Sequence, residues 1–371
     1  MVERLDINPN ILSYYIEQST VPMDYLQTKF KDIDAILDGS KKPTFNQLSK
    51  ISQLINVPTG LLLLSDTVNA NKSILKFRTI NSDCIEKASS ELKDTIVEMK
   101  TKQDFLKNEI DYKLKFVGEF SITDDYLRVV NVIRKYLNIS TSYQKEAGRD
   151  QNALKYFRNK ISQMGIFVFF NSSVKNNTHR SLSVNEFRGF VLSDERAPII
   201  FVNQKDSKSG QLFTLIHELV HLFIDKEEIF SVVDTGTYSY DRTEAFVNKV
   251  TAEILMPIDE IKKLNNYDID FLAQEFPVSK FVIIRRLRDM KILSNQEYKE
   301  EVLRLEKELK NTSPKKGSGG NYPNNLKFHF DTTFVHYIEN AINQNKITYT
   351  EAFNIAGVTY KSYKILTGGN N

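Results

Sequence analysis

The chain has 371 residues, 41% hydrophobic and 26% charged, an ordinary globular mixture that excludes a largely disordered protein and predicts two or three domains. Its 50 Lys and Arg against 47 Asp and Glu leave a formal charge of only +3, which does not favour wholesale binding to nucleic acid. One cysteine, Cys84, excludes a disulfide framework, and because there is no apolar leader and no apolar stretch of ~20 residues, we expect a cytoplasmic protein without a membrane span.

Residues 1–70 are predicted to form several short helices. The clearest is Thr44–Ile55, where apolar side chains recur every three or four residues. With Gly39 before it and Pro58 after it, this region resembles the second half of a phage-repressor-type helix-turn-helix domain. Residues 1–70 nevertheless contain 6 basic and 8 acidic residues, whereas a domain that neutralises phosphates should be basic. We therefore favour a degenerate helix-turn-helix-like domain, kept for packing or partner contact, over operator binding.

The middle of the chain changes from helical to strand-forming sequence. A long polar helix is predicted at 88–116 and another helix at 124–137. Three runs rich in strand formers follow, and we expect them to make a small three-stranded sheet: Ile166–Phe170, Phe187–Leu192 and Pro198–Val202.

Helical periodicity returns at Gly210 and continues through Leu309. A Gly- and Pro-rich polar stretch then predicts a flexible linker. The expected fold is α+β and mainly α, with five segments: a helical, helix-turn-helix-like domain at 1–70, a helical connector at 71–122, a central domain at 123–310, the linker at 311–325 and a small C-terminal helical unit at 326–371.

The strongest chemical signal lies in Thr214–Phe223. Its two histidines, His217 and His221, would face the same side of a helix and could hold one divalent ion, while Glu218 could reach a metal-bound water. This is the HExxH pattern of zincin peptidases. The alternative is a helix whose histidines are satisfied by carboxylates, but apolar neighbours that would fix the helix rigidly favour a metal site: Phe213, Ile216, Leu219, Val220 and Phe223.

Two histidines leave the coordination incomplete, so we expect a third protein ligand downstream and a fourth position for water. Glu244 is the best candidate, because it opens an amphipathic helix that begins 23 residues after His221. Asn248, one turn further on, would lie on the same face and could orient a ligating histidine. The alternative third ligands are Asp241 and Glu253.

An HExxH motif followed by a Glu-x-x-x-Asn helix that ends in Leu255-Met256-Pro257 resembles the ImmA/IrrE metallopeptidases. The resemblance covers roughly residues 123–300 and includes the strand pair before the motif. It implies a zincin-like peptidase domain, one zinc ion per chain on His217, His221 and Glu244, and Glu218 as the catalytic carboxylate.

The same resemblance carries implications about partners. Members of this family relieve transcriptional repression by cleaving a regulator, and proteins of this architecture often occur beside toxin genes. One departure concerns packing behind the site, because Val247 and Val250-Thr251 stand where many members have smaller residues.

The predicted chemistry is hydrolysis of a peptide bond. Zinc would activate a water and polarise the scissile carbonyl, while Glu218 transfers the proton to the leaving nitrogen. Manganese or cobalt could also occupy such a site, and only the ligand types favour zinc. For the oxyanion, the nearest candidates in sequence are Tyr238, Tyr240 and Arg242, although each is more often a surface residue.

We also expect a strand edge beside the metal to align an extended peptide by backbone pairing. The candidate residues are Ile199, Ile200, Phe201 and Val202, with a plain core strand as the alternative.

Two functions follow. The leading one is a zinc endopeptidase that cleaves a partner regulatory protein, expected to be a DNA-binding transcriptional repressor. The alternative is a non-catalytic regulatory or antitoxin-like protein that binds a toxin-like partner or DNA, with a structural or vestigial metal site. Glu218 favours the enzyme, because a structural zinc site usually closes its fourth position with protein. DNA contact is not favoured, although residues 279–316 carry 11 basic against 6 acidic residues.

Overall fold

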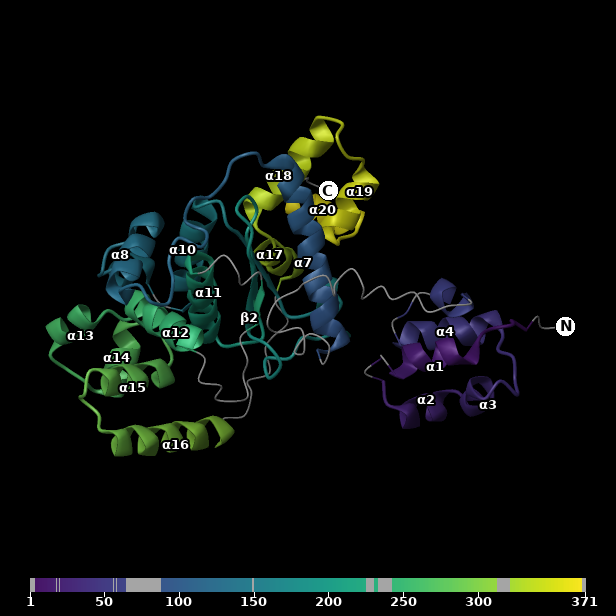
Figure 1. Cartoon of the computed structure of the whole chain (residues 1–371), viewed down its shortest axis with the longest axis horizontal. Coiled ribbons are helices and arrows are strands. Elements are labelled where there is room, and N and C mark those ends of the chain that lie inside the picture. Colours follow the sequence, from purple (N-terminus) through teal and green to yellow (C-terminus); the bar gives the residue numbers. More distant parts are fainter. Residues whose placement is uncertain are drawn as a thin grey trace. The chain divides into compact units, whose positions relative to one another are not determined.

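A computed structural model describes residues 4–17, 19, 21–55, 57, 59–64, 88–148, 150–224, 230–232, 242–311 and 321–368. The chain divides into two compact units, Met1–Lys93 and Asp94–Asn371. The described part is mainly helical with one small sheet (Figure 1), which confirms the predicted α+β, mainly α class.

The first unit consists of short helices around a small apolar core. Its elements are α1 (Pro9–Glu17), α2 (Met23–Lys29), α3 (Ile33–Leu37), α4 (Phe45–Ile55) and the 3-10 helix η1 (Thr59–Leu63). Helix α4 was predicted, and its start is fixed by Thr44 and Gln47, whose side chains each accept a hydrogen bond from the other's backbone N–H. The buried side chains that hold the helices together include Leu12, Leu26, Ile33, Leu48 and Ile51.

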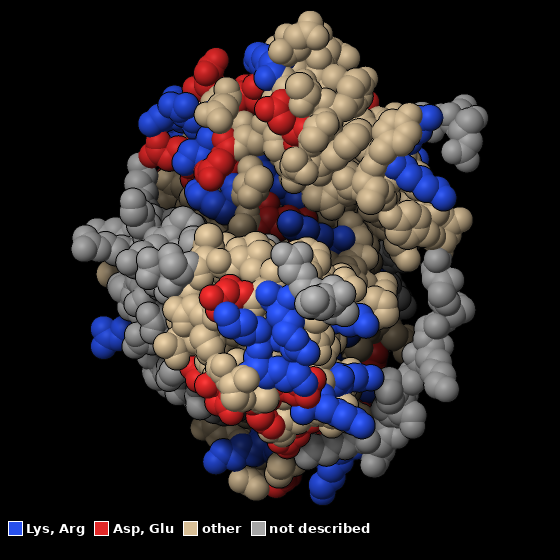
Figure 2. Space-filling view, turned by 90° about the vertical axis from the view of Figure 1, so that its right-hand side faces the viewer, with Lys and Arg blue, Asp and Glu red and all other residues tan. Residues whose placement is uncertain are grey.

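Two ion pairs lie on the surface of this unit. Lys41 lies 2.7 Å from Asp32, and Lys42 lies 3.0 Å from Asp6. Helix α3 has 5 residues. Figure 2 shows one face of the molecule, on which several Lys and Arg side chains lie together near the centre with Asp and Glu side chains around them.

The predicted connector is described from residue 88 onward, and this part begins with a helix. Helix α7 (Ser90–Glu109) ends earlier than predicted, because the chain beyond it runs along the loop between two strands, where Leu114 N–H donates to the Glu195 carbonyl at 2.6 Å. Helix α8 (Tyr126–Leu137) matches its prediction and is capped by the Asp125 side chain. Two further helices, α9 (Gln144–Ala147) and α10 (Asp150–Gln163), precede the sheet.

The sheet has the strand order β1-β3-β2-β4. The three predicted strands are present as β1 (Phe167–Asn171), β2 (Gly189–Leu192) and β3 (Ile199–Asn203), and the 3-10 helix η2 (Val174–Asn176) follows β1. A fourth strand, β4 (Phe230–Val232), pairs with β2. β1 and β3 are parallel, and the other pairs are antiparallel. In Figure 1 the sheet stands between α11 on one side and α7 with the C-terminal helices on the other.

The expectation that β3 offers its edge to a peptide is wrong. β3 is paired with β1 on one side and with β2 on the other, so its backbone groups are already used. Its four candidate residues are fully buried: Ile199, Ile200, Phe201 and Val202.

The outer side of β1 is closed by side chains. Val168 N–H donates to the Asp331 carboxylate at 3.2 Å, and the Val168 carbonyl accepts from Arg158 at 3.0 Å. This arrangement blunts an edge that would otherwise be free to pair.

Six described helices follow β3 along the chain. They are α11 (Lys208–Phe223), α12 (Arg242–Leu255), α13 (Ile258–Leu264), α14 (Ile269–Glu275), α15 (Lys280–Asp289) and α16 (Asn295–Asn311). α11 packs directly on β2 and β3. Gly189 permits this approach, because an added Cβ would lie 2.5 Å from Thr214 Cγ2 and 2.7 Å from the Phe201 carbonyl oxygen.

Several basic residues of α15 and α16 are paired with acidic side chains. Arg286 is buried and paired with Glu253, and Arg285 and Arg288 both contact Asp289. Arg304 pairs with Glu301 and Glu308 on its own helix. Apart from Glu253, these partners belong to residues 279–316 themselves, so the segment keeps most of its excess of basic residues.

The C-terminal helices cover the other face of the sheet. They are α17 (Tyr322–His329), α18 (Thr332–Asn343), α19 (Tyr349–Ala356) and α20 (Tyr360–Leu366). Phe169 of β1 packs against Phe330 and Phe334. Among the described residues, no helix combines the length and apolar character that a bilayer crossing requires.

Candidate metal centre

Helix α11 positions the two histidines. It begins at Ser207, whose hydroxyl accepts from Gly210 N–H, and its apolar residues Leu215, Leu219 and Val220 are fully buried. His217 and His221 are buried on one side of this anchored helix. The helix therefore holds the imidazoles in place before any ligand binds.

Glu244, in the first turn of α12, completes the site. Its carboxylate oxygens lie 3.2 Å from His217 Nε2 and 3.1 Å from His221 Nε2. The two Nε2 atoms are 3.1 Å apart. Atoms bound to one zinc ion at ~2.0–2.1 Å with tetrahedral angles lie roughly 3.3 Å from one another. The donor types and their spacing therefore fit one zinc ion, and within the described ranges these three residues are the group that could hold a metal.

The electrostatics of Glu244 suit a ligand. Burial by itself raises the pKa of Glu244, but hydrogen bonds and charge from His217 and His221 outweigh burial and hold the pKa well below its ordinary range. The carboxylate is thus in its ionised, metal-binding form.

The pKa of Glu218 is shifted in the opposite direction from that of Glu244. Its side chain is completely buried, and neither carboxylate oxygen accepts a hydrogen bond from a described residue. Burial raises the pKa of Glu218 well above its ordinary value, and the negative charge of Glu244 raises it further. A buried carboxyl group without protein partners is costly unless it is neutral or contacts a polar group bound at the site. Such a group is suited to taking up and releasing a proton.

The other predicted site residues are placed differently. Asn248 is exposed, and the buried Nδ1 of His217 has no hydrogen-bond partner among the described residues, so Asn248 does not orient His217. Glu253 is buried, but it pairs with Arg286 and accepts Ile258 N–H at 3.3 Å. Arg242 is exposed at the start of α12. Asp241, Tyr238 and Tyr240 lie outside the described residues.

Several residues that hold α12 carried no sequence signal. Arg134 donates to the carbonyls of Glu253 and Ile254, both at 2.9 Å. Tyr143 donates to the Leu255 carbonyl at 2.6 Å, and Arg286 to the Met256 carbonyl at 3.0 Å. These bonds satisfy the last carbonyls of the helix and fix the element that presents Glu244.

Packing behind the centre is dense. Val247, Val250 and Thr251 of α12 are fully buried in the contact with α11 and its neighbours. These are the positions that we expected to depart from the family pattern, and the ligand atoms converge in front of them.

Comparison with known proteins supports this reading of the site. Residues 161–288 match the family model of the IrrE N-terminal-like domain, a peptidase family. The matched range includes His217, Glu218, His221 and Glu244, so the predicted family resemblance is confirmed for this part of the chain. The helix-turn-helix resemblance of the N-terminal region is not confirmed. No curated protein and no solved structure matched the chain.

Proposed function

Because residues 161–288 form an IrrE N-terminal-like domain, we propose that this chain is a zinc-dependent endopeptidase that cleaves a partner regulatory protein. The expected substrate is a DNA-binding transcriptional repressor. Cys84, the only cysteine, and the lack of an apolar membrane-crossing helix among the described residues support action in the cytoplasm.

The observation that carries the proposal is the buried Glu218 beside the converging His217, His221 and Glu244. A site built only to hold zinc has no use for a buried carboxyl group without a protein partner. A hydrolase needs one, because a proton must leave the attacking water and reach the leaving nitrogen.

Each residue then has a defined task. The two imidazoles and the Glu244 carboxylate hold the ion, and when bound, zinc supplies an acidified water and polarises the scissile carbonyl. Glu218 accepts the proton of the attacking water and returns it to the amide nitrogen as the peptide bond breaks. Its raised pKa favours the second transfer, because the protonated form is stable enough to act as an acid.

The sheet suggests how a peptide could be aligned. Since β3 is internal and Val168 of β1 is capped, the remaining described strand at an edge is β4. We propose that the substrate pairs its backbone with β4, in place of the β3 residues expected from the sequence.

The test is a comparison of new protein N-termini in the native host expressing wild type or Glu218→Gln, in stress and in normal growth. Glu218→Gln should keep the metal and remove the proton acceptor. Glu306→Gln, an exposed carboxylate on α16, is the matched control.

We expect a discrete cleavage product with wild type and Glu306→Gln that is absent with Glu218→Gln. Identical N-termini in all three strains would contradict the proposal. The non-catalytic alternative would then predict a stable complex, and partner capture would be the next measurement.

A further inference from the structure

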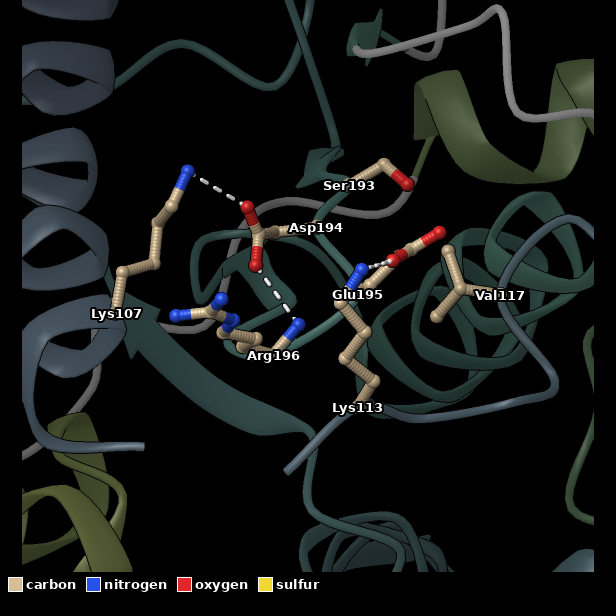
Figure 3. A pocket seen from close by; sticks show the side chains of 7 residues that line it. All are labelled: Lys107, Lys113, Val117, Ser193, Asp194, Glu195 and Arg196. Carbon is tan, nitrogen blue, oxygen red and sulfur yellow. Dashed lines mark hydrogen bonds and ion pairs between the residues drawn. The ribbon is translucent and has the colours of Figure 1, made fainter. Parts of the chain in front are cut away.

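A hollow with charged walls lies in the second unit, and none of the metal ligands lines it. Its volume is about 490 Å³, and it lies at the loop that joins β2 to β3 (Figure 3). This volume falls within the ~300–1,000 Å³ typical of small-molecule sites. Its walls are Lys107, Lys113, Val117, Ser193, Asp194, Glu195 and Arg196.

The two acidic residues of the pocket are already neutralised. Asp194 lies 2.7 Å from Lys107 Nζ, and Glu195 lies 2.7 Å from Lys113 Nζ. Asp194 also accepts the backbone N–H groups of Arg196 and Ala197, at 2.8 and 3.1 Å. Dashed lines in Figure 3 mark the two ion pairs and the bond from Arg196 N–H to Asp194.

Arg196 is the third cationic residue of the pocket, and unlike the two lysines it is not paired with either acidic residue. Its guanidinium is partly buried and makes no hydrogen bond or ion pair with any residue that the structure describes. A guanidinium has five N–H donors and remains charged, and each paired ammonium group has further donors. The walls therefore carry one net positive charge and several unused donors.

The loop is also held rigidly. Gln103, a buried residue of α7, donates to the carbonyls of Leu192 and Ala197, both at 3.0 Å. The Glu195 carbonyl accepts Leu114 N–H at 2.6 Å. A preorganised arrangement of donors loses little entropy when a ligand binds.

We infer that this pocket binds a small molecule through a carboxylate or phosphate group. Arg196 would contact two oxygens of the anion, since the guanidinium fork matches both groups. Lys107 and Lys113 would contribute their remaining donors, and Ser193 lies among the walls as a hydroxyl donor.

The experiment is a titration of the full chain by isothermal calorimetry, once with inorganic phosphate and once with succinate. Chloride keeps the ionic strength constant. Saturable binding with phosphate alone identifies a phosphate site, and binding with succinate alone identifies a carboxylate site.

Two substitutions should change the affinity in opposite directions. Arg196→Ala should weaken binding about tenfold, because it removes the unpaired cation. Glu195→Gln should strengthen binding about threefold, because it frees Lys113 from its carboxylate. Arg304→Ala, which changes an arginine on α16 outside the pocket, should leave the affinity unaltered.

Equal affinity of wild type and Arg196→Ala, or heat that chloride alone reproduces, would overturn the inference. If Arg196→Ala does not fold, Glu195→Gln decides, since misfolding cannot tighten binding. The readout is independent of peptide cleavage, so its failure leaves the proposed function unaffected.

Discussion

The Nε2 atoms of His217 and His221 lie 3.1 Å apart, with Glu244 oxygens as close to each of them. Both Nε2 atoms and the Glu244 carboxylate therefore face one position, where a single ion would contact all three side chains.

One expected consequence is stabilisation by zinc. At a free concentration a hundred times the dissociation constant, one zinc ion should add about 2.7 kcal/mol to the free energy of unfolding. For a unit of this size the melting temperature should rise by roughly 5–10 °C. Calorimetric titration should give one ion per chain. His221→Ala should abolish both effects, and His179→Ala, an exposed loop histidine, should preserve them. Equal losses in both variants would argue against the assigned ligands.

Two carboxylates of α12 should behave oppositely when each is replaced by glutamine. Glu244→Gln should lower zinc affinity at least about a hundredfold with little change in apo stability, because a neutral amide replaces an ionised ligand. Glu253→Gln should retain zinc affinity. It should lower the free energy of unfolding by about 3 kcal/mol, because buried Arg286 loses its charged partner. Zinc titration and urea unfolding measure the two quantities separately. Weakened zinc binding in Glu253→Gln alone would reverse the ligand assignment.

Gly189→Ala should destabilise the second unit by about 1–3 kcal/mol, because the new methyl group meets Thr214 and a strand carbonyl that cannot both move away. Gly60→Ala is the control, since no heavy atom lies within 4 Å of the added Cβ. Urea unfolding of the two variants tests the prediction. A stable Gly189→Ala protein would show that α11 can withdraw from the sheet.

His329 should make stability depend on pH. Burial and, to a lesser extent, the positive charge of Arg158 together lower the pKa of His329 to about 4. The unfolded chain binds a proton near pH 6.5, whereas the folded chain stays neutral until about pH 4, so the unfolded state holds more protons between these values. The free energy of unfolding should therefore fall by about 2–3 kcal/mol as the pH drops from 6.5 to 4.

The check is urea unfolding at several pH values. His329→Gln should flatten this part of the pH profile relative to wild type. His336→Gln, an exposed histidine on α18, should keep the wild-type slope. Parallel profiles for wild type and His329→Gln would remove His329 as the cause.

The parts of the fold and site that could be predicted depend on local patterns. His217 and His221 converge because helical periodicity alone brings residues four apart together. Glu244 could be predicted as the third ligand because it lies at the start of a clear amphipathic helix. Asn248 follows Glu244 by one turn of the same helix, but its side chain is exposed there.

The features that could not be predicted are contacts between residues far apart in the sequence. An apolar run such as Ile199–Val202 identifies a strand but not its neighbours, so its internal position could not be read from the sequence. β4 has three residues and no distinct pattern. The bonds from Arg134 and Tyr143 to α12 join residues more than a hundred positions apart, and no sequence spacing indicates them.

Arg158 and Asp331 would hold the C-terminal helices on the second unit even if the backbone before them were cut. Arg158 donates to the carbonyls of Phe328 and Phe330, and Asp331 accepts from Ser162 and from Val168 N–H. A chain nicked between residues 311 and 321 would thus keep its last four helices bound through these bonds and the phenylalanine contacts. Such a nicked molecule would elute from a sizing column as one particle and separate into two fragments only in denaturant.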